Sequence, residues 1–185
     1  MKRAIIVHGW GGNPQEGWFL WLKGELGKRG YVVDVPEMPD TMRPTIDAWV
    51  GKLREVVGKP DSDLLLVGHS VGCQTILRYL ASIDNVIGRV VLVAPWVGLV
   101  GLGDDEEWSI ARPWLETSID FVSARKHARL FSLIFSDNDP FVELTNQKTL
   151  EESLGASSIV LHNKGHLSEE HGVVELPEIL KLIER

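Results

Sequence analysis

The chain has very little cysteine, since Cys73 is the only one among its 185 residues. A single cysteine excludes an intramolecular disulfide, and a lone thiol is typical of proteins in reducing compartments. Long hydrophobic runs are also missing. The apolar run within residues 1–8 is too short for a signal peptide or a membrane span. We therefore expect a soluble, cytoplasmic protein that does not bind membranes.

Clusters of basic side chains are absent as well. The 19 lysines and arginines are outnumbered by 26 aspartates and glutamates, which gives a formal net charge of −7. Affinity for nucleic acid comes largely from clustered lysine and arginine, so no nucleic-acid partner is expected. The densest charged run is acidic, at residues 104–107, and we interpret it as a solvated loop.

Metal and cofactor motifs are missing too. The sequence has no phosphate-loop lysine and no paired cysteines, and the three histidines between residues 162 and 171 lack a convincing set of further metal ligands. The glycines of residues 9–12 follow an apolar run, as in a dinucleotide-binding loop, but Pro14 occupies the position of the third glycine. We expect neither a metal nor a cofactor.

Six short runs rich in Val, Ile and Leu are present instead, at residues 3–8, 31–35, 64–67, 89–94, 130–135 and 158–161. Their nearly continuous apolar character is typical of parallel strands covered on both faces. Helical spacing of apolar residues occurs between them, at residues 16–29, 45–57, 71–83, 142–154 and 173–184. This alternation predicts a three-layer α/β/α sandwich around a mainly parallel six-stranded sheet.

Residues 95–128 are too long for one plain crossover connection, and they predict a small lid-like excursion over the sheet. No repeat, low-complexity tract or linker divides the chain. We therefore expect a single domain over residues 1–185.

The strongest local motif is Gly68-His69-Ser70-Val71-Gly72, directly after an apolar run and before a helical segment. This G-x-S-x-G pattern is typical of a nucleophile elbow, a turn so tight that only small residues fit two positions before and after the serine. The alternative is a glycine-lined turn in which Ser70 is a helix N-cap.

A nucleophilic serine needs a general base and a group that orients this base. His166 follows the last predicted strand and is the preferred base, with His171 in reserve. Asp137 and Asp139 both follow the fifth strand, and the alternative for this pair is an ordinary turn before a proline. The order serine, aspartate, histidine is that of α/β-hydrolases, with each residue after a strand of its own.

Two backbone N–H groups are expected to stabilise an oxyanion. The first is that of Val71, at the start of the helix after the elbow. The second comes from the glycine-rich turn after the first strand, from Trp10 or Gly11.

Tryptophan is abundant, with seven residues. Trp18, Trp21 and Trp49 lie in or beside amphipathic segments and are assigned to core packing. Three others, in the 95–128 segment, are candidates for the wall of an acyl-binding pocket. These are Trp96, Trp108 and Trp114. Cys73 is interpreted as a packed, inert thiol.

Four segments together, at residues 8–26, 64–80, 136–142 and 165–183, resemble the small serine hydrolases related to bacterial YdeN and to retinoblastoma-binding protein nine. The likeness spans nearly the whole chain. It implies an α/β-hydrolase fold with Ser70 as nucleophile, His166 as base and Asp139, not Asp137, as acid. The chain departs from the family pattern at Glu143, where proline is usual, and at Leu167, where an aromatic residue often follows the histidine.

These observations predict a cofactor-independent serine hydrolase that acts on short or accessible acyl esters through an acyl-enzyme. The expected partner is thus a small acyl substrate. The alternative is a protein-binding module that keeps a hydrolase shell and uses exposed Trp or Leu side chains of residues 95–118 for contact.

Overall fold

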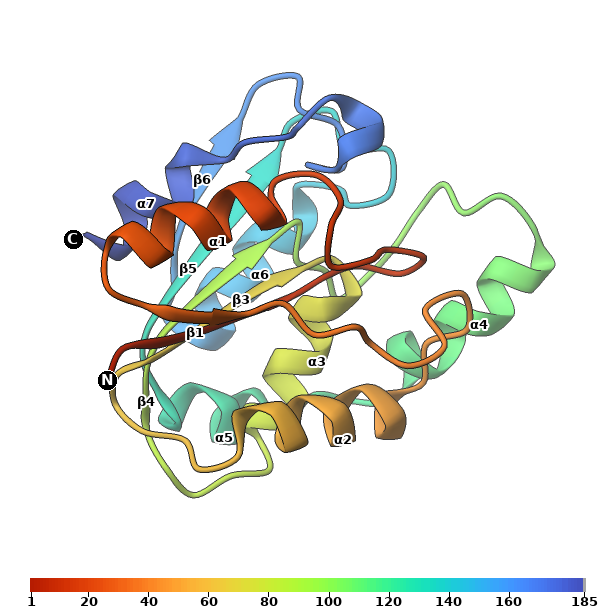
Figure 1. Cartoon of the computed structure of the whole chain (residues 1–185). Coiled ribbons are helices and arrows are strands. Elements are labelled where there is room, and N and C mark those ends of the chain that lie inside the picture. The colour runs from red at the N-terminus through yellow and green to blue at the C-terminus, as the bar shows by residue number, and fades with distance from the viewer. Residues whose placement is uncertain (185) are drawn as a thin grey trace.

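A computed structural model describes residues 1–184 and contains one six-stranded, entirely parallel sheet (Figure 1). Its spatial order is β2-β1-β3-β4-β5-β6, and parallel pairing places all strand carboxyl ends at one edge. The strands are β1 (Arg3–Val7), β2 (Val32–Asp34), β3 (Leu64–His69), β4 (Ile87–Val93), β5 (Ala128–Ser136) and β6 (Ser157–Leu161). All six predicted strands are confirmed.

Helices cover both faces of this sheet, which confirms the predicted three-layer sandwich (Figure 1). On one face, α1 (Phe19–Lys28) and α7 (Pro177–Ile183) pack against strand residues such as Ile6 and Val67. On the other, α2 (Ile46–Val57), α3 (Val71–Leu80), α5 (Phe121–Lys126) and α6 (Thr145–Leu154) pack against neighbouring strand residues such as Val7 and Leu66. Successive strand side chains point to opposite faces, so the apolar runs supply two cores at once.

The 95–128 segment differs from the prediction of a single excursion. It contains two helices, α4 (Asp105–Glu116) and α5, and α5 lies in the helical layer against α3 and α6. The α5 helix is therefore part of the crossover connection between β4 and β5. Only the portion that includes α4 extends away from the sheet (Figure 1). The candidate lid is thus shorter than the sequence indicated.

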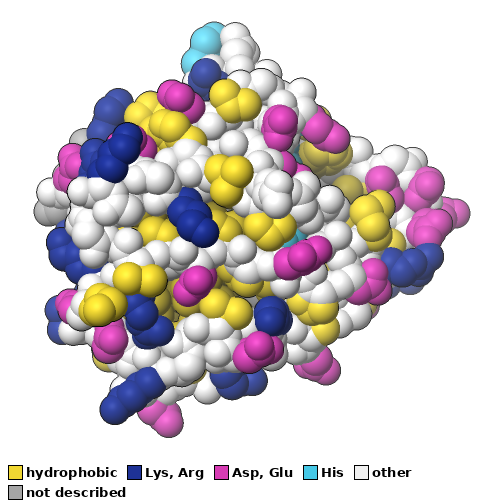
Figure 2. Space-filling view, viewed as in Figure 1, with side chains coloured by type: hydrophobic (Ala, Val, Ile, Leu, Met, Phe, Trp, Pro, Cys, Tyr) yellow, Lys and Arg dark blue, Asp and Glu magenta, His cyan; other side chains and the backbone are white. Residues whose placement is uncertain are grey.

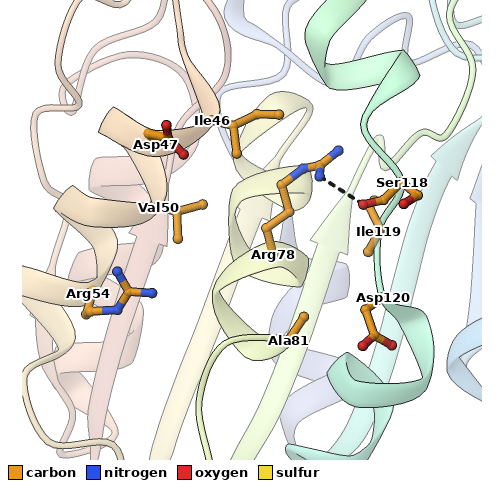
Figure 3. A pocket seen from close by; sticks show the side chains of 9 residues that line it. All are labelled: Ile46, Asp47, Val50, Arg54, Arg78, Ala81, Ser118, Ile119 and Asp120. Carbon is orange, nitrogen blue, oxygen red and sulfur yellow. Dashed lines mark hydrogen bonds between the residues drawn. The ribbon is translucent and has the colours of Figure 1, made fainter.

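The carboxyl end of α4 is fixed to the body of the protein. Arg78 of α3 donates hydrogen bonds to the carbonyl oxygens of Trp114 (3.1 Å), Thr117 (2.6 Å) and Ser118 (3.3 Å). Figure 3 shows Arg78 hydrogen-bonded to Ser118 in the wall of a hollow of about 440 Å³ that α2, α3 and residues 118–120 line. Trp114 also donates from its indole nitrogen to the carbonyl of Pro44 at 2.9 Å.

The remaining element is a short 3₁₀ helix, η1 (Glu169–His171), after β6. Within residues 1–184, no helix combines the length and apolar character needed to cross a bilayer.

Candidate active site

Ser70 occupies the sharp turn between β3 and α3. Its backbone has φ 52° and ψ −119°, a conformation that L-residues rarely adopt outside constrained sites. The Ser70 N–H donates to the carbonyl of Val93 at 2.9 Å, which ties the turn to β4. The Ser70 hydroxyl makes no capping hydrogen bond to α3. The backbone therefore matches an elbow rather than the N-cap alternative.

The two glycines of the motif are required by close backbone approach. A Cβ atom at Gly68 would lie 2.9 Å from the backbone of Gly72 and Cys73 in α3. At Gly72 a Cβ would collide with the carbonyl oxygens of Val7 and His8 at the end of β1. Because these contacts are to backbone, no side-chain rotation relieves them. The glycines hold the start of α3 tightly against the central strands.

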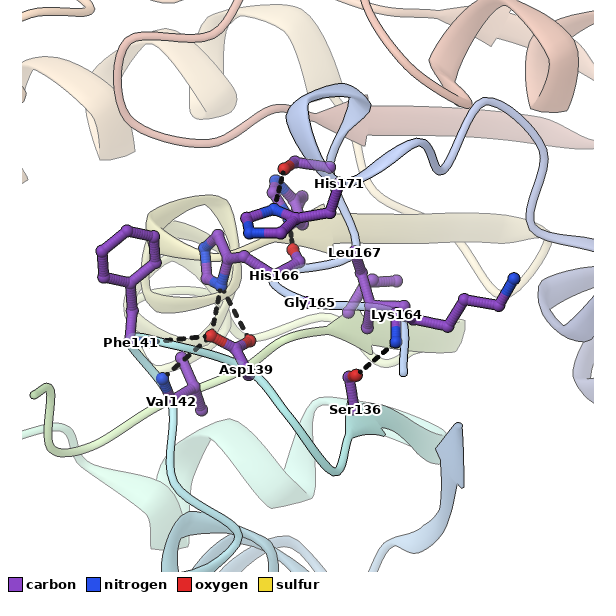
Figure 4. Close-up of polar contacts among 12 residues, drawn as sticks. Ser136, Asp139, Phe141, Val142, Lys164, Gly165, His166, Leu167 and His171 are labelled. Atoms are coloured by element: carbon purple, nitrogen blue, oxygen red, sulfur yellow. Dashed lines mark hydrogen bonds and ion pairs between the residues drawn. The ribbon is translucent and has the colours of Figure 1, made fainter. Parts of the chain in front are cut away.

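His166 and Asp139 form a largely buried pair on two adjacent loops (Figure 4). The Nδ1 atom of His166 lies 2.8 Å from Oδ2 and 3.1 Å from Oδ1 of Asp139. The side chains are 12% and 1% exposed, respectively. Asp139 Oδ1 also accepts the backbone N–H groups of Phe141 (2.9 Å) and Val142 (3.0 Å). These hydrogen bonds fix the Asp139 carboxylate. They involve only Nδ1 of His166, so Nε2 takes no part in them.

Asp137 and His171 have other partners. Asp137 lies 2.6 Å from Nδ1 of His162, whose side chain is 80% exposed, and accepts the N–H of Asn163 at 2.8 Å. Hydrogen bonds from Asn163 and His162 lower the pKa of Asp137. His171 contacts the hydroxyl of Ser168 at 3.0 Å. The structure thus brings His166 to Asp139, and not to Asp137.

Side chains after β5 hold the backbone of the loop that carries His166. Asp137 binds the N–H of Asn163, the hydroxyl of Ser136 accepts the N–H of Lys164 at 3.0 Å, and Oδ1 of Asn138 accepts the N–H of Gly165 at 2.8 Å. Together with the Asp139–His166 pair, residues 136–139 bind residues 163–166, an arrangement we call the loop ladder. It continues the β5–β6 pairing beyond the ends of the strands.

We expect Asn138→Ala to lower kcat about tenfold with little change in KM. The substitution removes the acceptor for Gly165 and for the Ser136 hydroxyl, which lies 2.9 Å from it, so the backbone beside His166 loosens. Asn138→Asp keeps an acceptor oxygen and should restore most of the rate. Steady-state kinetics of both variants check this. Equal kcat in Asn138→Ala and the unmodified protein would show that the ladder does not position the histidine.

His69, which the sequence analysis included only as part of the Gly68–Gly72 turn, contacts the backbone of His166. Its Nε2 lies 2.8 Å from the carbonyl oxygen of His166, so Nε2 carries the proton and donates it. Burial lowers the pKa of His69 to about 3, and the neighbouring His166 adds to this effect. The two rings lie 5.0 Å apart. The only sequence signal was its position directly before Ser70.

The buried, neutral state of His69 predicts acid sensitivity. A histidine whose folded pKa is lowered takes up protons more readily when unfolded, so stability falls as pH drops from 6.5 towards 3, by up to about 1.4 kcal/mol per pH unit. His69→Gln should flatten this slope in urea unfolding experiments between pH 7 and pH 5. Replacement of the exposed His171 serves as the control. An unchanged slope in His69→Gln would contradict the assignment.

The expected oxyanion donors differ in their availability. The N–H of Gly11 donates to the carbonyl of Thr41 at 2.8 Å and is therefore occupied. The indole nitrogen of Trp10 donates to the carbonyl of Met42 at 2.9 Å, which fixes the turn. Within residues 1–184, the backbone N–H groups of Trp10 and Val71 have no such partner. Of the two alternatives in the glycine-rich turn, Trp10 is the available donor.

A cavity of about 730 Å³ contains Ser70 and His166 on its wall. Trp96 lines it, whereas Trp108 and Trp114 do not. Trp114 instead packs in the core, with its ring 6.3 Å from that of Trp49. The side chains of Trp96 and Trp114 are almost fully buried, so they do not form the exposed contact surface expected of a binding module.

Cys73 lies beneath the elbow and faces the core. It is fully buried, and its thiol donates to the carbonyl of Val93 at 3.3 Å. Burial raises the pKa of the Cys73 thiol. The predicted packing of Cys73 is confirmed, and the raised pKa favours the protonated, less nucleophilic thiol.

Comparison with known proteins gives concordant results. The family model described as serine hydrolase matches residues 4–185. YdeN of Bacillus subtilis (strain 168), whose designation as a hydrolase is provisional, is 26% identical over 185 residues, covering 98% of this chain and 94% of YdeN. The crystal structure of the B. subtilis ydeN product superposes with a TM-score of 0.90 at 25% identity, covering 100% and 97% of the two chains. Est1E from Butyrivibrio proteoclasticus, solved with bound ferulic acid, shares the fold, with a TM-score of 0.75, 16% identity and coverage of 100% and 90%.

Proposed function

Because this chain belongs to the serine hydrolase family, we propose that it hydrolyses carboxylic esters through a Ser70–His166–Asp139 triad. The observation that carries the proposal is the largely buried His166–Asp139 pair, whose histidine lines the same cavity as the elbow serine. The three residues end or follow three parallel strands, β3, β5 and β6, so their loops meet at one edge of the sheet.

In the first step, Ser70 Oγ attacks the ester carbonyl carbon while Nε2 of His166 takes the hydroxyl proton. Asp139 accepts the Nδ1 proton of His166 in a hydrogen bond and stabilises the imidazolium that forms. The N–H groups of Val71 and Trp10 bind the oxyanion. Collapse of the tetrahedral intermediate breaks the bond to the alcohol, which leaves with the proton held by His166.

The second step reverses these roles. His166 Nε2 removes a proton from water, the resulting hydroxide attacks the acyl-enzyme, and the tetrahedral intermediate collapses to the acid. The proton returns from His166 to Ser70 Oγ. All proton transfers are carried by side chains of this chain.

The proposed substrates are esters with short or accessible acyl groups. The extension that carries α4 is short, and from residues 97–116 only Leu99, Leu102 and Glu107 contribute to the wall of the cavity. A cavity of about 730 Å³ accommodates a small molecule. The single, buried cysteine supports a location in a reducing compartment such as the cytoplasm.

A series of 4-nitrophenyl esters with acyl chains of increasing length tests the proposal. We expect turnover to be highest for short chains and to fall at least about 10³-fold in Ser70→Ala, because the nucleophile is lost. Circular dichroism of Ser70→Ala establishes that the fold is retained. Similar turnover by the variant and the unmodified protein would refute a Ser70 mechanism.

A further inference from the structure

The cavity beside Ser70 has an acidic wall. Four glutamates line it, and its lining residues include neither lysine nor arginine. These glutamates are Glu16, Glu107, Glu169 and Glu170. None of them forms an ion pair with a cationic side chain within residues 1–184. Figure 2 shows acidic side chains on both sides of the hollow next to the α4 extension.

These carboxylates come from three segments, and those of Glu16, Glu107 and Glu169 accept backbone N–H groups. Glu16 accepts the N–H of Asn13 at 3.2 Å, and Glu169 accepts the N–H of Gly17 at 2.7 Å. Glu107 lies on α4, across the cavity. Burial raises the pKa of Glu16, and the negative charges of Glu169 and Glu170 raise it further. Three carboxylates therefore share one side of the opening and repel one another.

Aromatic rings complete the same cavity. Trp10, Trp96 and Phe141 line it together with the glutamates. Trp96 is 3% exposed, and its indole N–H has no hydrogen-bond partner within residues 1–184, so this wall residue has a donor left for an oxygen atom of a bound ester. Aromatic faces attract ammonium groups, and carboxylates without a counter-ion add to that attraction. An anionic ligand would meet repulsion and no compensating cation.

We propose that the cavity selects esters that carry a positively charged ammonium group and rejects esters that carry a negative charge. The inference rests on the proposed function, since it names the substrate class of the same site. The acidic wall attracts the cationic substrate during its approach, and the half-buried rings of Trp10 and Phe141 contact the ammonium group once it is bound. The two contributions favour the same charge on the substrate.

Three thioacetates of similar shape test the proposal. Acetylthiocholine carries a trimethylammonium group, 3,3-dimethylbutyl thioacetate is its uncharged carbon analogue, and 3-(acetylthio)propanoate is anionic. All three release a thiol, so one colorimetric assay gives kcat/KM for each. A parallel series of 4-nitrophenyl esters places a trimethylammonium, tert-butyl or carboxylate group at the end of the acyl chain, because either half of the substrate can face the acidic wall.

In at least one series we expect kcat/KM to be about tenfold or more higher for the cationic ester than for the neutral one, and lowest for the anionic ester. The cation-to-neutral ratio should fall towards one in 0.5 M NaCl, because salt screens the charges. It should also fall in the double variant Glu16→Gln/Glu170→Gln, which removes two charges while each glutamine keeps an acceptor oxygen.

The matched control is Glu55→Gln/Glu152→Gln, which changes net charge equally at exposed positions on α2 and α6. This control should keep the ratio of the unmodified protein. Ratios of one in both series, or an equal fall in the control, would overturn the inference. If Ser70 is required for hydrolysis of the neutral esters, either of these outcomes overturns only the charge selection and leaves the proposed function intact. Ser70-independent turnover of the neutral esters would instead refute the proposed function.

Discussion

Asp139→Asn is expected to lower kcat by about 10³–10⁴-fold. Oδ1 of Asp139 accepts two backbone N–H groups, so the amide oxygen of asparagine will keep that position and its NH₂ group will face Nδ1 of His166. A donor opposite Nδ1 forces the proton of the imidazole onto Nε2. His166 then cannot accept the proton of Ser70, although the geometry of the site is preserved.

The matched variant is Asp137→Asn, two residues away. Asp137 contacts His162 and the N–H of Asn163, so its replacement perturbs only the outer end of the loop ladder. We expect a loss of less than about tenfold. Ester turnover of the two variants, each normalised to the folded protein, provides the comparison. A larger loss in Asp137→Asn would mean that the catalytic acid has been assigned to the wrong carboxylate.

Gly72→Ala is expected to destabilise the protein by about 3 kcal/mol or more, because its Cβ would collide with the carbonyl oxygens of Val7 and His8 at the end of β1. Neither the start of α3 nor the central strand can move without disrupting the core on both faces of the sheet. Urea unfolding measures the change in the free energy of unfolding.

Gly51→Ala provides a control that should change the free energy of unfolding in the opposite direction. Gly51 lies within α2, and a Cβ there meets nothing within 4 Å. Alanine at a solvent-exposed helix position is expected to stabilise the protein by about 0.5–1 kcal/mol. If Gly72→Ala were as stable as Gly51→Ala, this result would contradict the claim that α3 lies too close to the end of β1 for a Cβ atom at position 72.

The sheet was predictable because apolar runs of four to six residues, bounded by turn signals, are typical of buried strands. The tight turn at Ser70 was equally predictable, since two glycines at fixed positions reflect a geometric need that the structure explains at Gly68 and Gly72. The choice between Asp137 and Asp139 was not predictable from spacing. Both follow β5, and the direction of each carboxylate depends on loop contacts with residues 162–166, far away in the sequence.

Residues 95–128 show the same dependence on distant contacts. Trp114 was expected at the pocket, but it contacts Trp49 and Pro44, which lie more than 60 positions earlier in the chain. The short helix α5 has too few residues for a clear helical pattern, although it packs against α3 and α6. The role of His69 was also hidden, because its partner is a backbone carbonyl that no sequence pattern reveals.

Labelling with a fluorophosphonate probe tests the central claim most directly, since the probe reacts only with an activated serine. The protein is incubated with the probe, digested, and the modified peptide is identified by mass spectrometry, with Ser70→Ala treated in parallel. We predict one modification, on Ser70, and no labelling of the folded Ser70→Ala variant. Labelling of that variant to the same extent, or modification at another serine, would contradict the assignment of Ser70 as the nucleophile.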